Sequence, residues 1–162
     1  MPISNASRFT GLMLAALWLG QVSGAWGHCE IPCGIYGDEA RFDTLEEHCL
    51  TIEKSMTQIQ VLQKAEPKDL HALARWTLNK EEHANKIQHI VSQYFMTQRI
   101  KPEQPHYEKK ITTLHQMLVA AMKCKQTTDV AHVQTLRELL GEFRTLYFGK
   151  AEAEHLEEHH AR

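Results

Sequence analysis

Apolar side chains recur at alternating steps of three and four residues over long stretches of this 162-residue chain. In the first stretch they are Phe42, Leu45, Cys49, Ile52, Met56 and Ile59. This spacing places about one apolar side chain per turn on one face of an α-helix, so it predicts a helix with a single buried seam. Cys49 lies on that seam, and we expect its thiol to pack there as a small buried hydrophobic group.

Three further stretches carry the same spacing and predict three more helices. The second helix is expected to reach about residue 97, with Leu70, Leu73, Thr77, Lys80, Ala84, Ile87, Val91 and Tyr94 on its seam. The third is expected to end near residue 125, with Ile111, Leu114, Leu118 and Ala121 on its seam. The fourth is expected to end at Gly149, with Val130, Val133, Leu136, Leu140, Phe143 and Tyr147 on its seam.

Three residues in these helices carry separate expectations. Pro67 is expected in the first turn of the second helix, because the missing N–H of proline has no intrahelical partner to lose there. Lys80 is the one charged residue on a seam, and we expect it either to snorkel towards water or to lie at an interface. Cys124, in the last turn of the third helix, is expected to be a free thiol.

Four amphipathic helices with short connections predict an all-α fold, an antiparallel up-down four-helix bundle over residues 38–150. Pro102 and Pro105 mark the loop between the second and third helices. The chain length is that of one domain with a sizeable core. Residues 151–162 are charged and rich in histidine, and we expect them to form a flexible tail.

Charge and histidine placement exclude several functions. Lys and Arg number 18 against 20 Asp and Glu, and the basic residues do not cluster, so no nucleic-acid partner is expected. Helical bundles often bind paired metals through Glu-x-x-His motifs on facing helices. Here that motif occurs only in the proline-rich loop and the tail, which argues against a di-iron centre; the pairs are Glu103/His106, Glu152/His155 and Glu157/His160.

The first 27 residues predict a leader that is removed. Arg8 is followed by an apolar run over residues 12–19 and then by Ala25-Trp26-Gly27, which fits signal-peptidase cleavage after Gly27. The run is too short to span a membrane, which takes about 20 apolar residues. The alternative is a short anchor that stays attached. With cleavage, we expect an exported protein without stable membrane association and a leader-processing protease as a partner.

Cleavage would create a new N-terminus rich in metal donors. The mature chain would begin His28-Cys29-Glu30-Ile31-Pro32-Cys33-Gly34-Ile35-Tyr36. His28 would offer its amine and imidazole, Cys29 its thiolate and backbone nitrogen, and Cys33 a second thiolate. Nitrogen and sulfur donors in a plane favour Ni(II) or Cu(II) over the tetrahedral sites that zinc prefers. We define residues 28–37 as the hook.

The remaining hook residues suit this chemistry. Pro32 fixes a turn and Gly34 lets the chain leave it at low steric cost, which would bring Cys33 back to Cys29. Tyr36 could cover an open face of the metal. The alternative is a Cys29–Cys33 disulfide, which an oxidising compartment would favour.

At these residues the sequence closely resembles nickel-containing superoxide dismutase, whose hook reads His-Cys-x-x-Pro-Cys-Gly-x-Tyr. The fixed positions are His28, Cys29, Pro32, Cys33, Gly34 and Tyr36. Further segments look like family segments in the same order: Arg75 to His83, Tyr94-Phe95, Lys101-Pro102 and His106 to Lys109. The resemblance implies a dismutase that disproportionates superoxide by Ni(III)/Ni(II) cycling.

The resemblance also implies the residues of the site and the assembly. His28, Cys29 and Cys33 would bind one nickel per subunit, Tyr36 would gate access for superoxide, and the subunits would form a homohexamer. The family orients the axial imidazole through a Glu and then an Arg. The Glu position falls on Asp43 and the Arg position on His83, and Tyr94 is placed beside them around the site.

Two other functions stay open at this point. One is a non-catalytic exported protein that binds nickel or copper with the same hook. The other is a disulfide-stapled helical interaction module without a metal. The leader leaves the compartment open too: the protein is periplasmic or extracellular if the leader directs export, and cytoplasmic if it is a propeptide removed without export.

Overall fold

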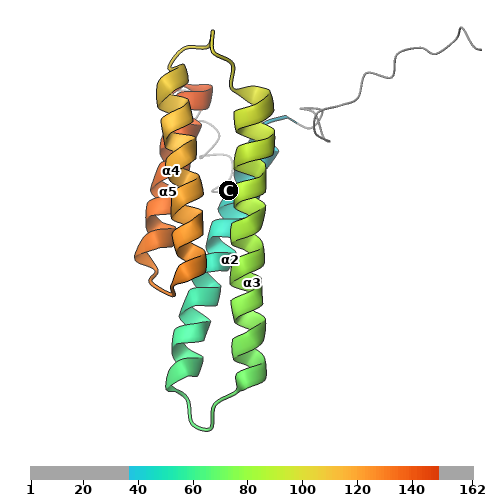
Figure 1. Ribbon diagram of the computed structural model, residues 1–162, viewed down its shortest axis with the longest axis vertical. Coiled ribbons are helices and arrows are strands. Elements are labelled where there is room, and N and C mark those ends of the chain that lie inside the picture. The colour runs from blue at the N-terminus through green and yellow to red at the C-terminus, as the bar shows by residue number, and fades with distance from the viewer. Residues whose placement is uncertain (1–36, 150–162) are drawn as a thin grey trace, which may run out of the picture. The chain divides into compact units, whose positions relative to one another are not determined.

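The computed structural model describes residues 37–149, and this part of the chain contains helices and no strand. The elements are α2 (Glu39–Lys64), α3 (Leu70–His89), the π-helix η1 (Ile90–Arg99), α4 (Tyr107–Gln126) and α5 (Ala131–Phe148). η1 continues α3 as one rod, and successive rods run in opposite directions (Figure 1). α2 packs most extensively on α3, and α4 on α5. The predicted antiparallel four-helix bundle is therefore confirmed.

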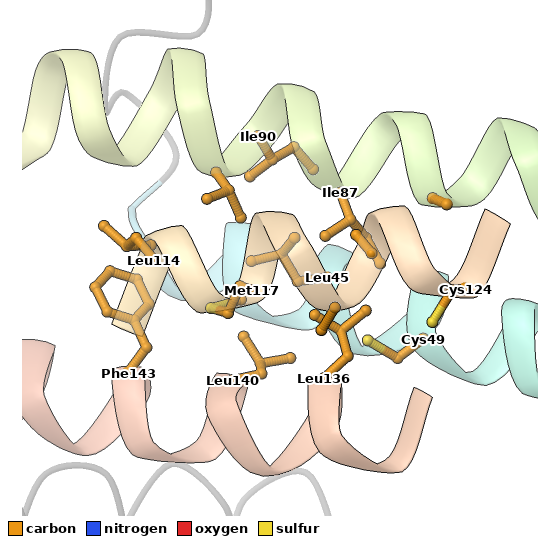
Figure 2. Close-up of a cluster of buried hydrophobic side chains, with 14 of the residues drawn as sticks. Leu45, Cys49, Ile87, Ile90, Leu114, Met117, Cys124, Leu136, Leu140 and Phe143 are labelled. Carbon is orange, nitrogen blue, oxygen red and sulfur yellow. The ribbon is translucent and has the colours of Figure 1, made fainter. Parts of the chain in front are cut away.

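The core is built from the predicted seams. All six seam residues of α2 are buried, and Cys49 is a free thiol with 1% of its surface exposed. Each helix contributes to one continuous apolar cluster between the rods (Figure 2). Cys124 at the end of α4 is also buried and free, as expected. Among residues 37–149, no helix is long and apolar enough to cross a membrane.

The seam prediction is wrong for the first two turns of α3. Leu70 is 71% exposed and Thr77 is exposed as well. The cause is the unequal length of the helices, since the α2–α3 hairpin runs past the turn between α4 and α5 (Figure 1). The seam of α3 therefore has nothing to pack against at that end, and it becomes buried only from Lys80 onward.

Pro67 lies outside the first turn of α3, contrary to the prediction. It follows a cis peptide bond in the connection, and α3 begins at Leu70. Asp69 starts the helix by accepting a hydrogen bond at Oδ1 from the backbone N–H of Ala72, at 2.9 Å. A capping aspartate thus sets this helix start, as aspartates commonly do.

Lys80 lies at an interface between helices and is 3% exposed. Its ammonium Nζ donates to the carbonyl oxygens of Cys124 at 2.7 Å and Lys125 at 2.6 Å, and to Glu81 Oε1 at 2.8 Å. The last carbonyls of a helix have no intrahelical partner, so a lysine from α3 caps the end of α4. This explains why a charged residue occupies the seam.

The π-helical segment η1 was not expected from the sequence. Its side chains repeat the i to i+5 pattern: Thr97 Oγ1 donates to the Ser92 carbonyl at 2.8 Å. A π-helix brings residues five apart close together around its axis, whereas an α-helix separates them by about 140°. Tyr94 and Arg99 are five residues apart and therefore lie on the same side of η1.

Candidate metal centre

The hook residues His28, Cys29, Cys33 and Tyr36 lie outside the described residues. The description begins with Gly37, whose φ of +78° is a turn conformation that glycine adopts readily. Asp38 follows and precedes the first turn of α2. The described part of the predicted metal centre is therefore the set of bundle residues around Asp38, directly after the end of the hook.

Asp38 is the point where three elements meet. Tyr94 Oη, from η1, donates to its Oδ1 at 2.5 Å, and Tyr147 Oη, from α5, donates to its Oδ2 at 2.6 Å. Arg99, at the end of η1, donates to Oδ2 from Nη2 at 2.5 Å and from Nε at 3.2 Å. We call Asp38, Tyr94, Arg99 and Tyr147 the Asp38 clamp. It ties the residue after the hook to two other rods of the bundle.

The electrostatics of the clamp keep Asp38 ionised. Burial works to raise the pKa of Asp38, but the hydrogen bonds from Tyr147, Tyr94 and Arg99 outweigh it and hold that pKa below its usual value. Burial and the bond to Asp38 raise the pKa of Tyr147 to about 12, and they raise the pKa of Tyr94 as well. The hydrogen bond to Asp38 also raises the pKa of Arg99. At neutral pH the clamp is one carboxylate, one guanidinium and two neutral phenols.

Aromatic rings pack against the two tyrosines of the Asp38 clamp. Tyr147 packs on Phe42 with ring centroids 5.6 Å apart, and Phe42 stacks on Phe143 at 5.3 Å. Tyr94 packs edge-on against Phe95 at 5.2 Å. Such aromatic pairs add specific geometry to their burial. The two phenol rings are therefore packed against other aromatic rings as well as hydrogen-bonded to Asp38.

Cations gather over these rings. Arg41 lies 5.1 Å from the centroid of Tyr94, and Lys110 lies 5.7 Å from that of Tyr147. Arg144 lies 5.5 Å from the centroid of Phe42. Burial lowers the pKa of Lys110 from its ordinary value. Of these three cations, Arg144 is paired with Asp43 at 3.3 Å and Lys110 is buried.

The residues predicted to lie around the site have the following partners. Asp43 Oδ1 accepts a hydrogen bond from Arg144 Nη2 at 3.3 Å. His83 Nδ1 lies 3.1 Å from His48 Nδ1, between α3 and α2. Tyr94 belongs to the Asp38 clamp. Asp43 is thus hydrogen-bonded to Arg144, and His83 is hydrogen-bonded to His48.

The two histidines form a neutral pair. Burial, followed by the charges of His83 and Lys86, lowers the pKa of His48 to about 4. Burial and then Lys86 also lower the pKa of His83, against the opposing effect of Glu82. At neutral pH both rings are therefore uncharged, and the Nδ1–H of one ring donates a hydrogen bond to the Nδ1 of the other.

Sequence reasoning missed three members of the clamp: Asp38, Arg99 and Tyr147. In the sequence, Asp38 is distinguished only by its place before the first helix. Arg99 was predicted to lie in the loop after the second helix, and Tyr147 was predicted only as an apolar seam residue. No local signal pairs residues separated by 61 or 109 positions. Within residues 37–149, no group of three or more His, Cys, Asp or Glu side chains could hold a metal ion.

The predicted donors of the hook, with the amine that cleavage would create, fit a nickel ion. An amine, a backbone amide and two thiolates are the nitrogen and sulfur ligands that suit a square-planar d⁸ metal. The helical bundle together with this predicted donor set indicates an all-α metalloprotein.

The comparisons with known proteins give the family. The family model described as nickel-containing superoxide dismutase matches residues 23–151, which is most of the chain. The chain therefore belongs to this family, and it is an oxidoreductase that disproportionates superoxide with nickel as its cofactor. No curated protein and no solved structure matches the chain. Nothing in these findings favours a non-catalytic metal carrier.

Proposed function

We propose that one nickel per subunit is held by the first residues of the mature chain. The ligands are the amine and imidazole of His28, the backbone nitrogen and thiolate of Cys29, and the thiolate of Cys33. The single observation that carries this proposal is the donor set itself, because the family match spans it and its chemistry suits nickel.

Each hook group has a task that follows from its chemistry. Bound nickel supplies a one-electron Ni(III)/Ni(II) couple for a reaction in which two superoxide anions and two protons give oxygen and hydrogen peroxide. The two thiolates and the deprotonated amide of Cys29 donate negative charge, which stabilises the higher oxidation state. The imidazole of His28 would be a further nitrogen donor to the metal, and Tyr36 would restrict access to small molecules.

The bundle contributes attraction for the substrate. Superoxide is an anion, and the protein has a formal net charge of −2, so attraction must come from local cations. Arg41, Lys110 and Arg144 lie over the aromatic rings at the bundle end that carries Asp38. Lys101, exposed in the loop after η1, is a further candidate.

The leader and the assembly complete the proposal. A protease cuts after Gly27 and frees the amine of His28; the mature protein is then periplasmic or extracellular, or cytoplasmic if the leader is not an export signal. The homohexamer is what the family resemblance implies. Four apolar side chains on α2 and α3 are exposed in the single chain and would be available to such an assembly. They are Leu50, Val61, Leu70 and Leu78.

Substitution of the hook thiols tests the ligand set. Cys29→Ser and Cys33→Ser are each expected to abolish stoichiometric nickel binding and dismutase activity, because a neutral hydroxyl cannot replace a thiolate donor. Metal analysis together with intact mass, followed by a superoxide dismutation assay, measures both. Cys124→Ala is the matched control and should keep its nickel, because Cys124 is a buried core thiol. Nickel retained at full occupancy in either serine variant would refute the ligand set.

A further inference from the structure

We propose that Asp38 is a positioning residue for the nickel hook. Its carboxylate fixes the place where the hook joins the bundle, and in doing so it strengthens nickel binding without touching the metal. This inference rests on the proposed hook ligands. It concerns a residue to which neither the family match nor the sequence pattern assigns a role.

Several donors converge on this one carboxylate. Tyr94, Tyr147 and Arg99 donate four hydrogen bonds to its two oxygens. Arg99 Nε also lies 3.3 Å from Tyr147 Oη, which links the donors to one another. A charged acceptor with several donors is among the stronger polar arrangements in proteins. Asp38 is therefore held from two rods at once.

Asp38 does not do the usual work of an aspartate at a helix start. It occupies the N-cap position of α2, but its side chain makes no capping hydrogen bond. Two other aspartates at helix starts behave differently. Asp69 accepts from the backbone N–H of Ala72, and Asp129 accepts from that of Ala131, at 2.9 and 3.0 Å. The carboxylate of Asp38 serves tertiary anchoring instead of its own helix.

The π-helical geometry of η1 serves the same carboxylate. Tyr94 and Arg99 reach Asp38 together because residues five apart share a side of η1, which they would not do in an α-helix. π-helical turns are frequently found at functional sites. Here the observed effect of the π-helix is to aim two donors at the residue that follows the hook.

Asp38 is also close to the proposed ligands along the chain. Only five residue steps separate it from Cys33, which is at most about 18 Å of extended chain. Binding a metal costs conformational entropy in proportion to the backbone freedom that the ligand residues lose. A fixed attachment point leaves less freedom to lose, so the clamp preorganises the hook for nickel.

The test is nickel affinity in Asp38→Asn, measured on the mature protein by competition with a chelator. We expect affinity to fall about 10-fold, which corresponds to the conformational-entropy cost of ordering one further residue. The Ni(II)–thiolate charge-transfer absorption should shift or broaden at saturating nickel. Asp129→Asn is the matched control, an aspartate at a helix start, and it should bind nickel like the wild type. Tyr147→Phe keeps the ring and removes one donor to Asp38, so it should give a smaller loss.

Each outcome decides for or against the role of Asp38. Unchanged nickel affinity and absorption in a folded Asp38→Asn protein would overturn the inference. An equal loss in Asp129→Asn would also overturn it, because general destabilisation would then explain both variants. If Asp38→Asn does not fold, Tyr147→Phe decides by the same two readouts. Nickel binding retained in Cys29→Ser would instead refute the proposed ligands, so the two failures are distinguishable.

Discussion

A single buried lysine, Lys80, satisfies the carbonyl groups at the end of α4. Lys80 interrupts the apolar seam of α3, and its ammonium donates three hydrogen bonds, two of them to the end of α4. The sequence could show that Lys80 breaks the pattern, but not which carbonyl oxygens it meets. Those oxygens, at Cys124 and Lys125, lie 44 and 45 residues away along the chain.

Replacement of Lys80 should measure the value of this cap. In Lys80→Met the side-chain stem is kept, and the carbonyls of Cys124 and Lys125 lose their charged donor. We expect the free energy of unfolding to fall by about 2 kcal/mol, as is typical when buried groups lose a charged hydrogen-bond partner. Urea denaturation measures it.

Lys86→Met is the control on the same helix. Lys86 pairs with Glu82 at 2.7 Å, but the two side chains are 46% and 63% exposed. Exposed pairs of this kind contribute about 0–1 kcal/mol. Equal losses in the two lysine variants would show that Lys80 is not a structural cap.

The His48–His83 pair belongs to the residue scale as well. Its ring nitrogens are 3.1 Å apart, so the pair can hold one proton between the rings but is destabilised by a second. The pKa of His48 is lowered to about 4, from an ordinary value of 6.5. Between these two values the unfolded chain binds more protons than the folded one, so the stability of the fold rises with pH.

This sign gives a prediction for acid stability. As pH falls from the ordinary pKa of 6.5 towards the lowered value of about 4, the free energy of unfolding should decrease. It should decrease less steeply in His48→Gln, which cannot be protonated in this range. Urea denaturation across this pH window measures the slope. His71→Gln, at an exposed position of α3, is the control and should keep the wild-type slope. Identical slopes in wild type and His48→Gln would contradict the expectation.

At the scale of elements, the spacing of apolar residues was enough to predict the helices and their order. It could not predict where a helix lacks neighbours. α2 has 26 residues, whereas α4 has 20 and α5 has 18, so the seam of α3 runs out of partners near Leu70. Helix lengths alone do not say which ends align, because alignment depends on packing between rods.

The π-helix was also beyond sequence reasoning. The apolar pattern around Ile90 and Val91 continues that of α3, and both residues are buried as an α-helical seam requires. Only the partners of Tyr94 and Arg99 reveal why the wider turn matters, since both meet Asp38. The bundle was thus predictable, whereas the Asp38 clamp depends on contacts between segments that are distant along the chain.

At the scale of the whole molecule, a donor-rich N-terminal hook precedes a helical bundle. In the bundle, Asp38 directly follows the hook and is held by Tyr147, and Arg41 lies over the ring of Tyr94. Membership of the nickel-containing superoxide dismutase family gives the reaction. The central claim is that the chain becomes a nickel enzyme only when the bond between Gly27 and His28 is cut.

Nickel content and dismutase activity of a chain with one extra residue test this claim most directly. A mature protein that begins at His28 should bind one nickel and turn over superoxide. The same protein with Gly27 retained should bind no stoichiometric nickel and show no activity, because its first amine lies one residue away from the donor set. An extra glycine after Arg162 is the control and should change neither property. Full nickel occupancy and activity with Gly27 in place would contradict the claim.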